Sequence, residues 1–464
     1  MADIAPPPPA FAIHFPVVIV GGGGTGLSAA LAAHDGGTTP LVLERDSTPL
    51  GSTAMSTGLI PAAGTPEQAA LGIDDSPARF VADIMAKTKG RTDPDFALLL
   101  ASESAETIAW LRDRHGAALS LMDGWLYPGH SAKRMYGTPH RTGGELMAAL
   151  ESAVAACDIP VLTEATVDRL YMVEDRVTGV RVARPDGTTE DIGCDALILA
   201  CSGFGGNAAL VARHIPDMAG AVYHGHPGNR GDALDWGQRI GALVEDIGAY
   251  QGHGGLAAGH GVPILWPLIM EGGFQVNAAG RRFSDESSGY SEQAAIVNAQ
   301  PGHVAWSIFD ARCHRMMLAF DDYQDALRAG AVTEAADIES LAAACGLPAP
   351  ALGETLEQAA RATRGECADP FGRDFTGKPA LAAPYYAAKV TGALFHTQGG
   401  LAIDEAARVR KAAGGAFSNL YAGGGAARGI SGDGADGYLA GNGLLAATTL
   451  GKLAGRSAAR SVTR

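Results

Sequence analysis

Residues 16–26 constrain the fold of this chain more than any other segment. A short apolar run ends in three spaced glycines, Gly21, Gly23 and Gly26, and a stretch rich in alanine and leucine follows at once. The first glycine allows a tight turn, the second lets the backbone approach a phosphate, and the third lets helix and strand pack closely. The pattern therefore predicts a strand, a turn and a helix that begins against the pyrophosphate of a dinucleotide.

A second apolar run, 40–43, places Glu44 at the end of another strand. Glu44 follows Gly26 at close to the roughly 20 residues at which such a carboxylate meets the ribose hydroxyls of a dinucleotide. A glycine turn without a nucleotide is the alternative. The two flanking strands favour the nucleotide site, so we expect Glu44 to bind ribose.

Length and charge exclude several classes of protein. A chain of 464 residues is long enough for two or three domains. Its formal net charge of -15 argues against nucleic acid as a partner, because such proteins need dense Lys and Arg contacts to phosphate. No apolar run approaches about 18 residues and the N-terminus does not resemble a signal peptide, so we expect no membrane span and a soluble, cytoplasmic protein.

The six cysteines are scattered and form no CxxC pair, which predicts neither a metal site nor a disulfide framework. Cys313 and His314 invite comparison with a haem attachment motif, but Asp310 stands where its first cysteine belongs. We therefore expect no haem domain.

The order of the predicted elements indicates a domain built from both ends of the chain. Residues 161–167 and 177–183 resemble strands of a small antiparallel meander, and 196–206 is a buried strand that ends in a second glycine turn. The pattern then changes to mixed helices and loops. We expect an α/β, Rossmann-like domain from 1–245 and 386–464, with an α+β capping domain at 246–385.

Five landmarks follow one another in an order that identifies a family. They are segments 21–26, 51–58, 202–206, 280–286 and 437–445. In kind and spacing they resemble the flavoproteins that include fumarate reductase, succinate dehydrogenase and the 3-ketosteroid dehydrogenases. The resemblance covers most of the chain.

The resemblance implies an FAD cofactor. Members that attach FAD covalently use a histidine in the loop matching 51–58, and this chain has none there, so we expect non-covalent binding. Ser52 and Thr53 would lie near FAD, with simple helix capping as their alternative role. The helix from Asn442 would bring partial positive charge to the reduced flavin. The expected cofactor-binding residues are Gly21, Gly23, Gly24, Thr25, Gly26, Glu44, Arg45, Ser52, Thr53, Ser56, Gly58, Ala165, Ser202, Gly203, Asp232, Gly424, Asn442, Leu444 and Leu445.

Two histidines match positions that bind substrate oxygens in fumarate reductases. His253 lies in Gln251-Gly-His-Gly-Gly255, and His396 opens the more complete match His396-Thr-Gln-Gly-Gly400. A purely structural histidine is the alternative at both positions.

Tyr290 stands where fumarate reductase carries its proton-donating arginine, four residues after Glu286. The 3-ketosteroid dehydrogenases have a tyrosine in a similar place, where it acts as general base. A phenol with an ordinary pKa of about 10 would need a nearby cation or helix dipole, and Arg281 or Arg282 is a candidate cation. A buried tyrosine of the capping domain is the alternative role.

The loop 423–434 offers backbone N–H groups for a substrate oxygen, and Tyr438 adds a hydroxyl. Arg428 is an alternative anchor, because fumarate reductases hold a substrate carboxylate with an arginine in this segment. An arginine in that role would favour a small acid over a steroid.

These residues lead to three hypotheses. The first is an FAD-dependent dehydrogenase that introduces a C=C bond beside the carbonyl of a cyclic ketone, keto acid or 3-ketosteroid, with an external electron acceptor. The second is a fumarate-reductase-like enoate reductase, which the absence of a haem domain disfavours. The third is a non-catalytic flavin-binding partner protein. The expected catalytic residues are Tyr290, His396, His253, Arg428 and Tyr438.

Overall fold

A computed structural model describes residues 3–124 and 126–463. The chain divides into two compact units. Unit 1 comprises Met1–His214, Gly225–Tyr250 and His396–Arg464, and unit 2 comprises Ile215–His224 and Gln251–Phe395. No helix in the described part of the chain is both long and apolar enough to cross a membrane.

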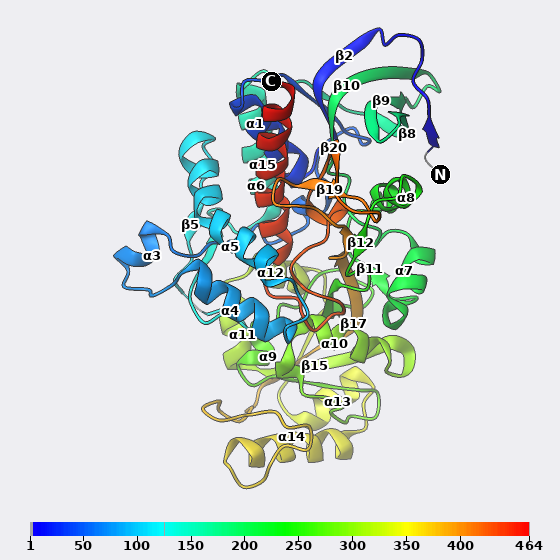
Figure 1. Cartoon of the computed structure of the whole chain (residues 1–464). Coiled ribbons are helices and arrows are strands. Elements are labelled where there is room, and N and C mark those ends of the chain that lie inside the picture. The colour runs from blue at the N-terminus through cyan, green and yellow to red at the C-terminus, as the bar shows by residue number, and fades with distance from the viewer. Residues whose placement is uncertain (1–2, 125, 464) are drawn as a thin grey trace. The chain divides into compact units, whose positions relative to one another are not determined.

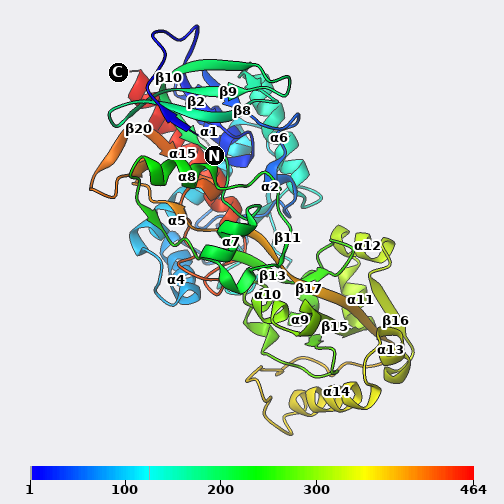
Figure 2. The ribbon, with the colours of Figure 1, turned by 90° about the vertical axis from the view of Figure 1, so that its right-hand side faces the viewer.

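A nine-stranded sheet forms the centre of unit 1. Five parallel strands lie in the order β20, β10, β2, β3, β7. An antiparallel meander of β8 and β9 continues from the other half of β10, and Figure 2 shows β8, β9 and β10 together. The strands are β1 (Asp3–Ala5), β2 (Ile13–Val20), β3 (Pro40–Leu43), β7 (Val161–Leu162), β8 (Thr166–Val173), β9 (Arg176–Ala183), β10 (Thr189–Leu199), β19 (Arg408–Arg410) and β20 (Ala416–Ala422). The inner strands are continuous apolar runs because both of their faces are buried.

Helices α1 (Gly24–Asp35) and α15 (Asn442–Val462) run side by side in unit 1 (Figure 1). Two glycines of α15 permit this close approach. A Cβ added at Gly455 would lie 2.1 Å from the Ala29 carbonyl oxygen, and one at Gly451 would lie 2.4 Å from that of Thr25. The packing places the start of α15 in the same part of unit 1 as the glycine turn.

The other elements of unit 1 surround this core. Strands β4 (Ile60–Pro61), β5 (Ser120–Leu121) and β6 (Met135–Gly137) form a small sheet, and β12 (Val244–Glu245) pairs with β18 (Gly400–Leu401). The remaining α-helices are α2 (Gly51–Ala54), α3 (Pro66–Ala70), α4 (Pro77–Thr88), α5 (Pro94–Ala109), α6 (Gly143–Ala156), α7 (Ala208–His214) and α8 (Asp232–Arg239).

Unit 2 is built on a six-stranded sheet in which β15 pairs antiparallel with the long strand β17. Its strands are β11 (Val222–Tyr223), β13 (Tyr250–Ala257), β14 (Phe274–Val276), β15 (Val304–Asp310), β16 (Val332–Ala335) and β17 (Tyr385–Thr397). Its α-helices are α9 (Pro267–Met270), α10 (Tyr290–Asn298), α11 (Ala311–Met317), α12 (Asp321–Arg328), α13 (Ile338–Cys345) and α14 (Ala349–Thr363). Two apolar clusters form its core. The sequence-based boundaries at 245/246 and 385/386 stay a prediction.

Candidate active site

The glycine turn between β2 and α1 has the geometry that its sequence predicts. Gly21 has a φ of +106°, and a Cβ at Gly26 would lie 1.8 Å from the Gly21 carbonyl oxygen. A Cβ at Gly23 would meet nothing within 4 Å. Helix α1 begins at Gly24 without a side-chain cap. Two glycines are therefore required by the turn itself, whereas Gly23 leaves space beside the start of the helix.

Glu44 is held rigidly at the end of β3. Its buried carboxylate accepts the Gly22 N–H at 2.7 Å and the Asp46 N–H at 2.9 Å. Arg45 donates to the Gly228 carbonyl at 2.7 Å. The Ala165 N–H donates to the Glu44 carbonyl at 2.8 Å, so contact between Ala165 and an adenine would have to use its own carbonyl.

The loop of α2 is tied to the glycine turn. Thr53 accepts the Gly24 N–H at 3.2 Å, and Ser52 accepts the N–H of His226 at 3.0 Å. Neither hydroxyl caps α2, but Thr53 pairs with the first N–H of α1, so the capping alternative fits Thr53 at that helix. Ser56 donates to the Thr53 carbonyl at 2.7 Å and accepts the N–H of Gly58 at 3.2 Å.

The second glycine turn, after β10, lies against the end of β17. Ser202 has a φ of +64°, and a Cβ at Gly203 would lie 1.9 Å from Thr397 Oγ1. The Gly203 carbonyl accepts the N–H of Gly231, which precedes Asp232 at the start of α8. Burial raises the pKa of the Asp232 carboxyl.

The start of α15 carries an amide that lacks a protein partner. Asn442 is fully buried, and neither its Oδ1 nor its Nδ2 meets a hydrogen-bond partner among the described residues. Buried amides rarely remain unpaired, so this one fits a bound group that offers both a donor and an acceptor. Leu445 is also buried, whereas Leu444 is half-buried. Gly424 lies against Thr25 of α1, because a Cβ added at Gly424 would lie 2.2 Å from Thr25 Oγ1.

A cavity lies beside the start of α15 within unit 1. It is partly open, and its volume together with the solvent at its mouth is about 230 Å³. Its lining residues come from the end of β17, the glycine loop after β20 and the first turns of α15, and they are His396, Thr397, Gln398, Gly424, Gly425, Gly429, Gly443 and Ala446.

His396 is a neutral hydrogen-bond donor at this cavity. Its Nδ1 lies 3.0 Å from the Gln398 side-chain amide nitrogen, whose own oxygen accepts from the Ser431 hydroxyl at 3.1 Å, and 3.4 Å from the Thr397 carbonyl oxygen. The shorter contact, with the Gln398 N–H, favours the tautomer with the proton on Nε2. Burial lowers the pKa of His396 to about 4. The Tyr438 ring packs edge-on, with ring centroids 5.7 Å apart.

Arg428 lies in a cluster of carboxylates. Its guanidinium contacts Glu245 directly and lies 3.5 Å from Asp246 and 3.8 Å from Asp93. These charges neutralise the cation without any substrate, so the geometry does not favour Arg428 as the anchor of a substrate carboxylate. The role of Arg428 as substrate anchor therefore stays a prediction, and its ion pairs with these carboxylates argue against it.

In unit 2, His253 lies at the centre of a stack of rings. Tyr290 and Phe395 each stack on its imidazole, at 5.3 and 5.1 Å between centroids, and Trp266 packs edge-on at 5.8 Å. His253 Nδ1 accepts the Gly255 N–H at 3.0 Å, which places the proton on Nε2. Burial, with a smaller effect of His224, lowers the pKa of His253 to about 3. His253 is thus a second neutral donor.

The two arginines considered as activators of Tyr290 are engaged elsewhere. Arg282 forms buried ion pairs with Glu286, at 2.8 Å, and with Asp369. Arg281 pairs with Glu354 on the surface. Tyr290 is instead the first residue of α10, so the positive end of that helix dipole is the charge nearest to it along the chain.

The structure therefore groups the predicted residues in two places. In unit 1, Thr25, Gly424, Asn442 and His396 share one region with Tyr438, and in unit 2 His253 stacks on Tyr290. Sequence reasoning missed Gln398, which fixes the tautomer of His396. Its place within the motif 396–400 was the available signal.

Comparison with known proteins supports an FAD cofactor. The family model described as "FAD binding domain" matches residues 16–444. A fumarate reductase (cytochrome) from Shewanella frigidimarina is 30% identical over 459 residues, covering 96% of this chain and 77% of that protein. An NADH:fumarate oxidoreductase from Klebsiella pneumoniae (strain 342) is 29% identical, and the match covers 96% of this chain but only 48% of that protein.

Solved structures show the same fold. The open conformation of a flavocytochrome c3 fumarate reductase has a TM-score of 0.84 at 26% identity, covering 98% of this chain and 80% of that chain. A 3-ketosteroid-Δ4-(5α)-dehydrogenase from Rhodococcus jostii RHA1 has a TM-score of 0.80 at 24% identity, covering 99% and 100%. The Rossmann-like α/β fold and the FAD cofactor expected from the sequence are confirmed. The chain therefore belongs to the FAD binding domain family and is an FAD-dependent oxidoreductase that acts on CH–CH groups.

Proposed function

We propose that this protein desaturates a neutral ketone, forming a C=C bond between the carbons α and β to the carbonyl. Tyr290 removes the α-proton, and His396, His253 or the glycine loop 423–434, to which Tyr438 could add a hydroxyl, hydrogen-bonds the carbonyl oxygen as it becomes enolate-like. The cofactor-binding residues expected from the sequence hold FAD without a covalent link. When bound, FAD supplies the two-electron acceptor that takes the β-hydrogen with its electron pair.

The reaction balances with these groups. The α-C–H bond breaks, its proton goes to the Tyr290 oxygen, and its electron pair becomes the second bond of the new C=C. The β-hydrogen leaves as hydride. Two electrons must then leave the protein to an external acceptor, which the proposal requires as a second substrate. A cytoplasmic location remains part of the proposal.

The proposal rests on the charge of the hydrogen-bond donors that would bind the substrate oxygen. Both histidines are neutral and present Nε2–H, a group suited to a carbonyl oxygen. The buried arginines considered for substrate or base, Arg428 and Arg282, are each occupied by carboxylates. A dicarboxylate would need cations of its own, because buried carboxylates are costly unless paired. This arrangement favours a ketone without an essential carboxylate.

The second candidate is an enoate reductase that runs the same chemistry in reverse, with Tyr290 as the proton donor. The relative that is 30% identical is a fumarate reductase, which is the observation in its favour. That protein and the one from Klebsiella extend beyond the match. An electron donor for this chain would therefore have to be a separate carrier or lie outside the matched region.

Anaerobic mixing separates the two directions. The FAD-loaded protein is mixed with a panel of cyclic ketones, 3-ketosteroids and four-carbon acids while the absorbance of the oxidised flavin is followed. Bleaching by a saturated ketone supports desaturation. If ketones leave the spectrum unchanged and fumarate-like enoates reoxidise the dithionite-reduced protein, the reductase is correct and the desaturase proposal fails.

A further inference from the structure

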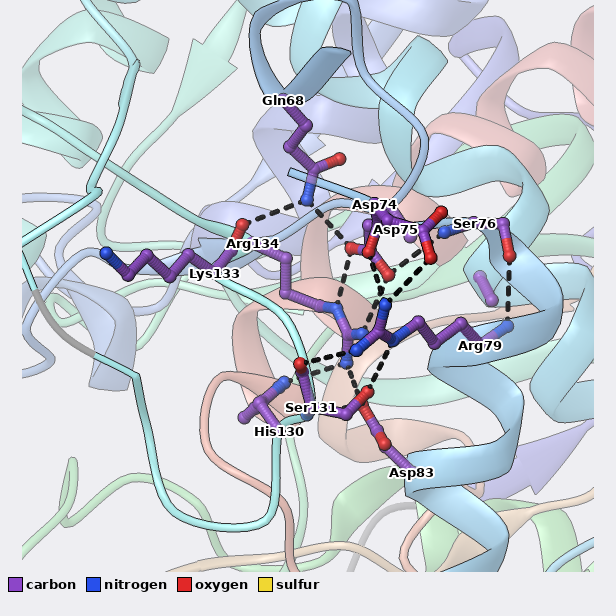
Figure 3. A network of polar contacts seen from close by, with 12 residues as sticks. Gln68, Asp74, Asp75, Ser76, Arg79, Asp83, His130, Ser131, Lys133 and Arg134 are labelled. Carbon is purple, nitrogen blue, oxygen red and sulfur yellow. Dashed lines mark hydrogen bonds and ion pairs between the residues drawn. The ribbon is translucent and has the colours of Figure 1, made fainter. Parts of the chain in front are cut away.

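A buried charge network in unit 1 lies outside the proposed catalytic groups. Arg134 is fully buried, and its guanidinium binds both oxygens of Asp75, at 2.8 and 2.9 Å, and Asp83 at 2.5 Å (Figure 3). Its Cζ lies 4.5 Å from the centre of the Phe80 ring. The fourth polar partner is Nδ1 of His130, at 3.1 Å.

The carboxylates of this network are also held from behind. Asp75 accepts from the Gln68 amide at 2.7 Å, and Asp83 accepts from both the N–H and the hydroxyl of Ser131, at 2.9 and 3.0 Å. A buried network with every member paired is rigid. Arg134 therefore presents a fourth N–H to His130 in a fixed direction.

This contact determines the tautomer of His130. A guanidinium only donates, so His130 Nδ1 accepts and the imidazole proton lies on Nε2. His130 Nε2 in turn lies 3.0 Å from the carbonyl oxygen of Ala440, to which it donates. Burial and the charge of Arg134 lower the pKa of His130 to about 4, so this donor persists at neutral pH.

Ala440 lies two residues before the start of α15. It lies between Tyr438 and Asn442, where α15 begins beside the cavity. The loop that carries His130 contacts the segment around Ala440 at a second point, because a Cβ added at Gly129 would lie 2.6 Å from the Leu439 side chain. The segment thus reaches the start of α15 with its carbonyl fixed by His130.

We infer that His130, oriented by Arg134, is a positioning residue that fixes the segment from Tyr438 to the first turn of α15. It acts through the Ala440 carbonyl and not by touching substrate. The kinetic part of this inference rests on the role proposed above for Tyr438. The structural part, that His130 fixes the Ala440 carbonyl, does not depend on the proposed reaction.

Two substitutions of His130 separate its hydrogen bond to Ala440 from its hydrogen bond with Arg134. In His130→Gln the side-chain amide occupies the place of Nε2 and still donates to Ala440, whereas in His130→Asn the amide occupies the place of Nδ1 and meets only Arg134. His140→Phe is the control variant, because it replaces an exposed histidine that pairs with Glu145 and takes no part in this network.

Hydrogen exchange of the FAD-loaded protein reads the effect without any substrate. We expect the amides of residues 440–445 to exchange about tenfold faster in His130→Asn, the factor that one lost hydrogen bond gives. His130→Gln should stay within about threefold of the wild type. With an active substrate, His130→Asn should lower kcat by a similar factor and leave KM nearly unchanged.

The opposite order of the two variants would overturn the inference. If His130→Gln exchanges as fast as His130→Asn, or faster, the donor to Ala440 is not what fixes the segment. A loss of melting temperature shared equally by both variants, with unchanged exchange at 440–445, shows a purely structural histidine. If no substrate is turned over, the exchange data still decide the positioning role, so its failure is distinct from failure of the proposed reaction.

Discussion

At the residue scale, the buried amide of Asn442 is one place where hydrogen bonding within the protein is incomplete. Both polar atoms of this side chain are buried without a partner among the described residues. A bound group that pairs with the amide removes a desolvation cost of about 1–3 kcal/mol. The amide therefore offers a direct test of FAD contact.

We expect Asn442→Leu to weaken FAD binding by about tenfold to a hundredfold, because the lost pairing is worth about that much. Thr449→Val is the matched control, since the Thr449 hydroxyl on the same helix is also buried and unpaired. Its replacement should leave FAD affinity unchanged. Fluorescence titration of the FAD-free protein measures both, and equal affinities for wild type and Asn442→Leu would contradict the assignment.

Residue by residue, the sequence was most informative where one local pattern determines the geometry. The glycine turn could be predicted because Gly21 and Gly26 satisfy requirements a few residues apart. The contacts of Arg428 with Glu245, and of His130 with Ala440, could not, because 183 and 310 residues separate the partners. No period or motif encodes such pairs.

At the element scale, the packing of α1 against α15 holds the start of α15 beside the glycine turn. Gly455 permits it, since an added Cβ would lie 2.1 Å from a backbone oxygen that cannot move independently. We expect Gly455→Ala to destabilise the protein by about 1–3 kcal/mol through overpacking.

Gly144→Ala is the matched control in the same unit. It lies in α6, and its added Cβ would meet only the Thr142 hydroxyl at 3.9 Å. Alanine should be neutral or slightly stabilising there. Urea denaturation of both variants checks the pair, and the account of the helix contact is wrong if Gly455→Ala is as stable as Gly144→Ala.

At the scale of the whole molecule, three histidines with lowered pKa values make stability depend on pH: the buried His130 and His253 and the half-buried His396. Burial lowers the pKa values of His130 and His396 to about 4 and of His253 to about 3. Their unfolded values are about 6.5. Below pH 6.5 the unfolded chain binds more protons than the folded one, so the free energy of unfolding falls as the pH falls.

Each of the three histidines should contribute a slope approaching roughly 1.4 kcal/mol per pH unit below about pH 6, which is lost again as the pH nears its folded pKa. Buried carboxyls with raised pKa values, Asp232 and Asp246, act in the opposite direction. His253→Gln isolates one histidine and should flatten the dependence. Urea midpoints at pH 7.5 and 5.5 measure it, and a slope unchanged by the substitution would refute the role of this residue.

The overall architecture was the easiest property to predict, because the order of five landmarks specifies it. The chemistry was harder, since the relatives include reductases of acids while the donor set of this chain is neutral. Sequence alone placed Arg428 among the candidate anchors. Only the structure showed that carboxylates already surround it.

The rate of flavin reduction in a single turnover tests the central claim most directly. The saturated ketone that bleaches the wild type fastest is mixed anaerobically with wild type and Tyr290→Phe. If Tyr290 is the base, the rate in Tyr290→Phe falls by about 10²- to 10⁴-fold, while the spectrum of the oxidised flavin stays unchanged. A rate within about threefold of the wild type would contradict the assignment of Tyr290 and with it the proposed mechanism.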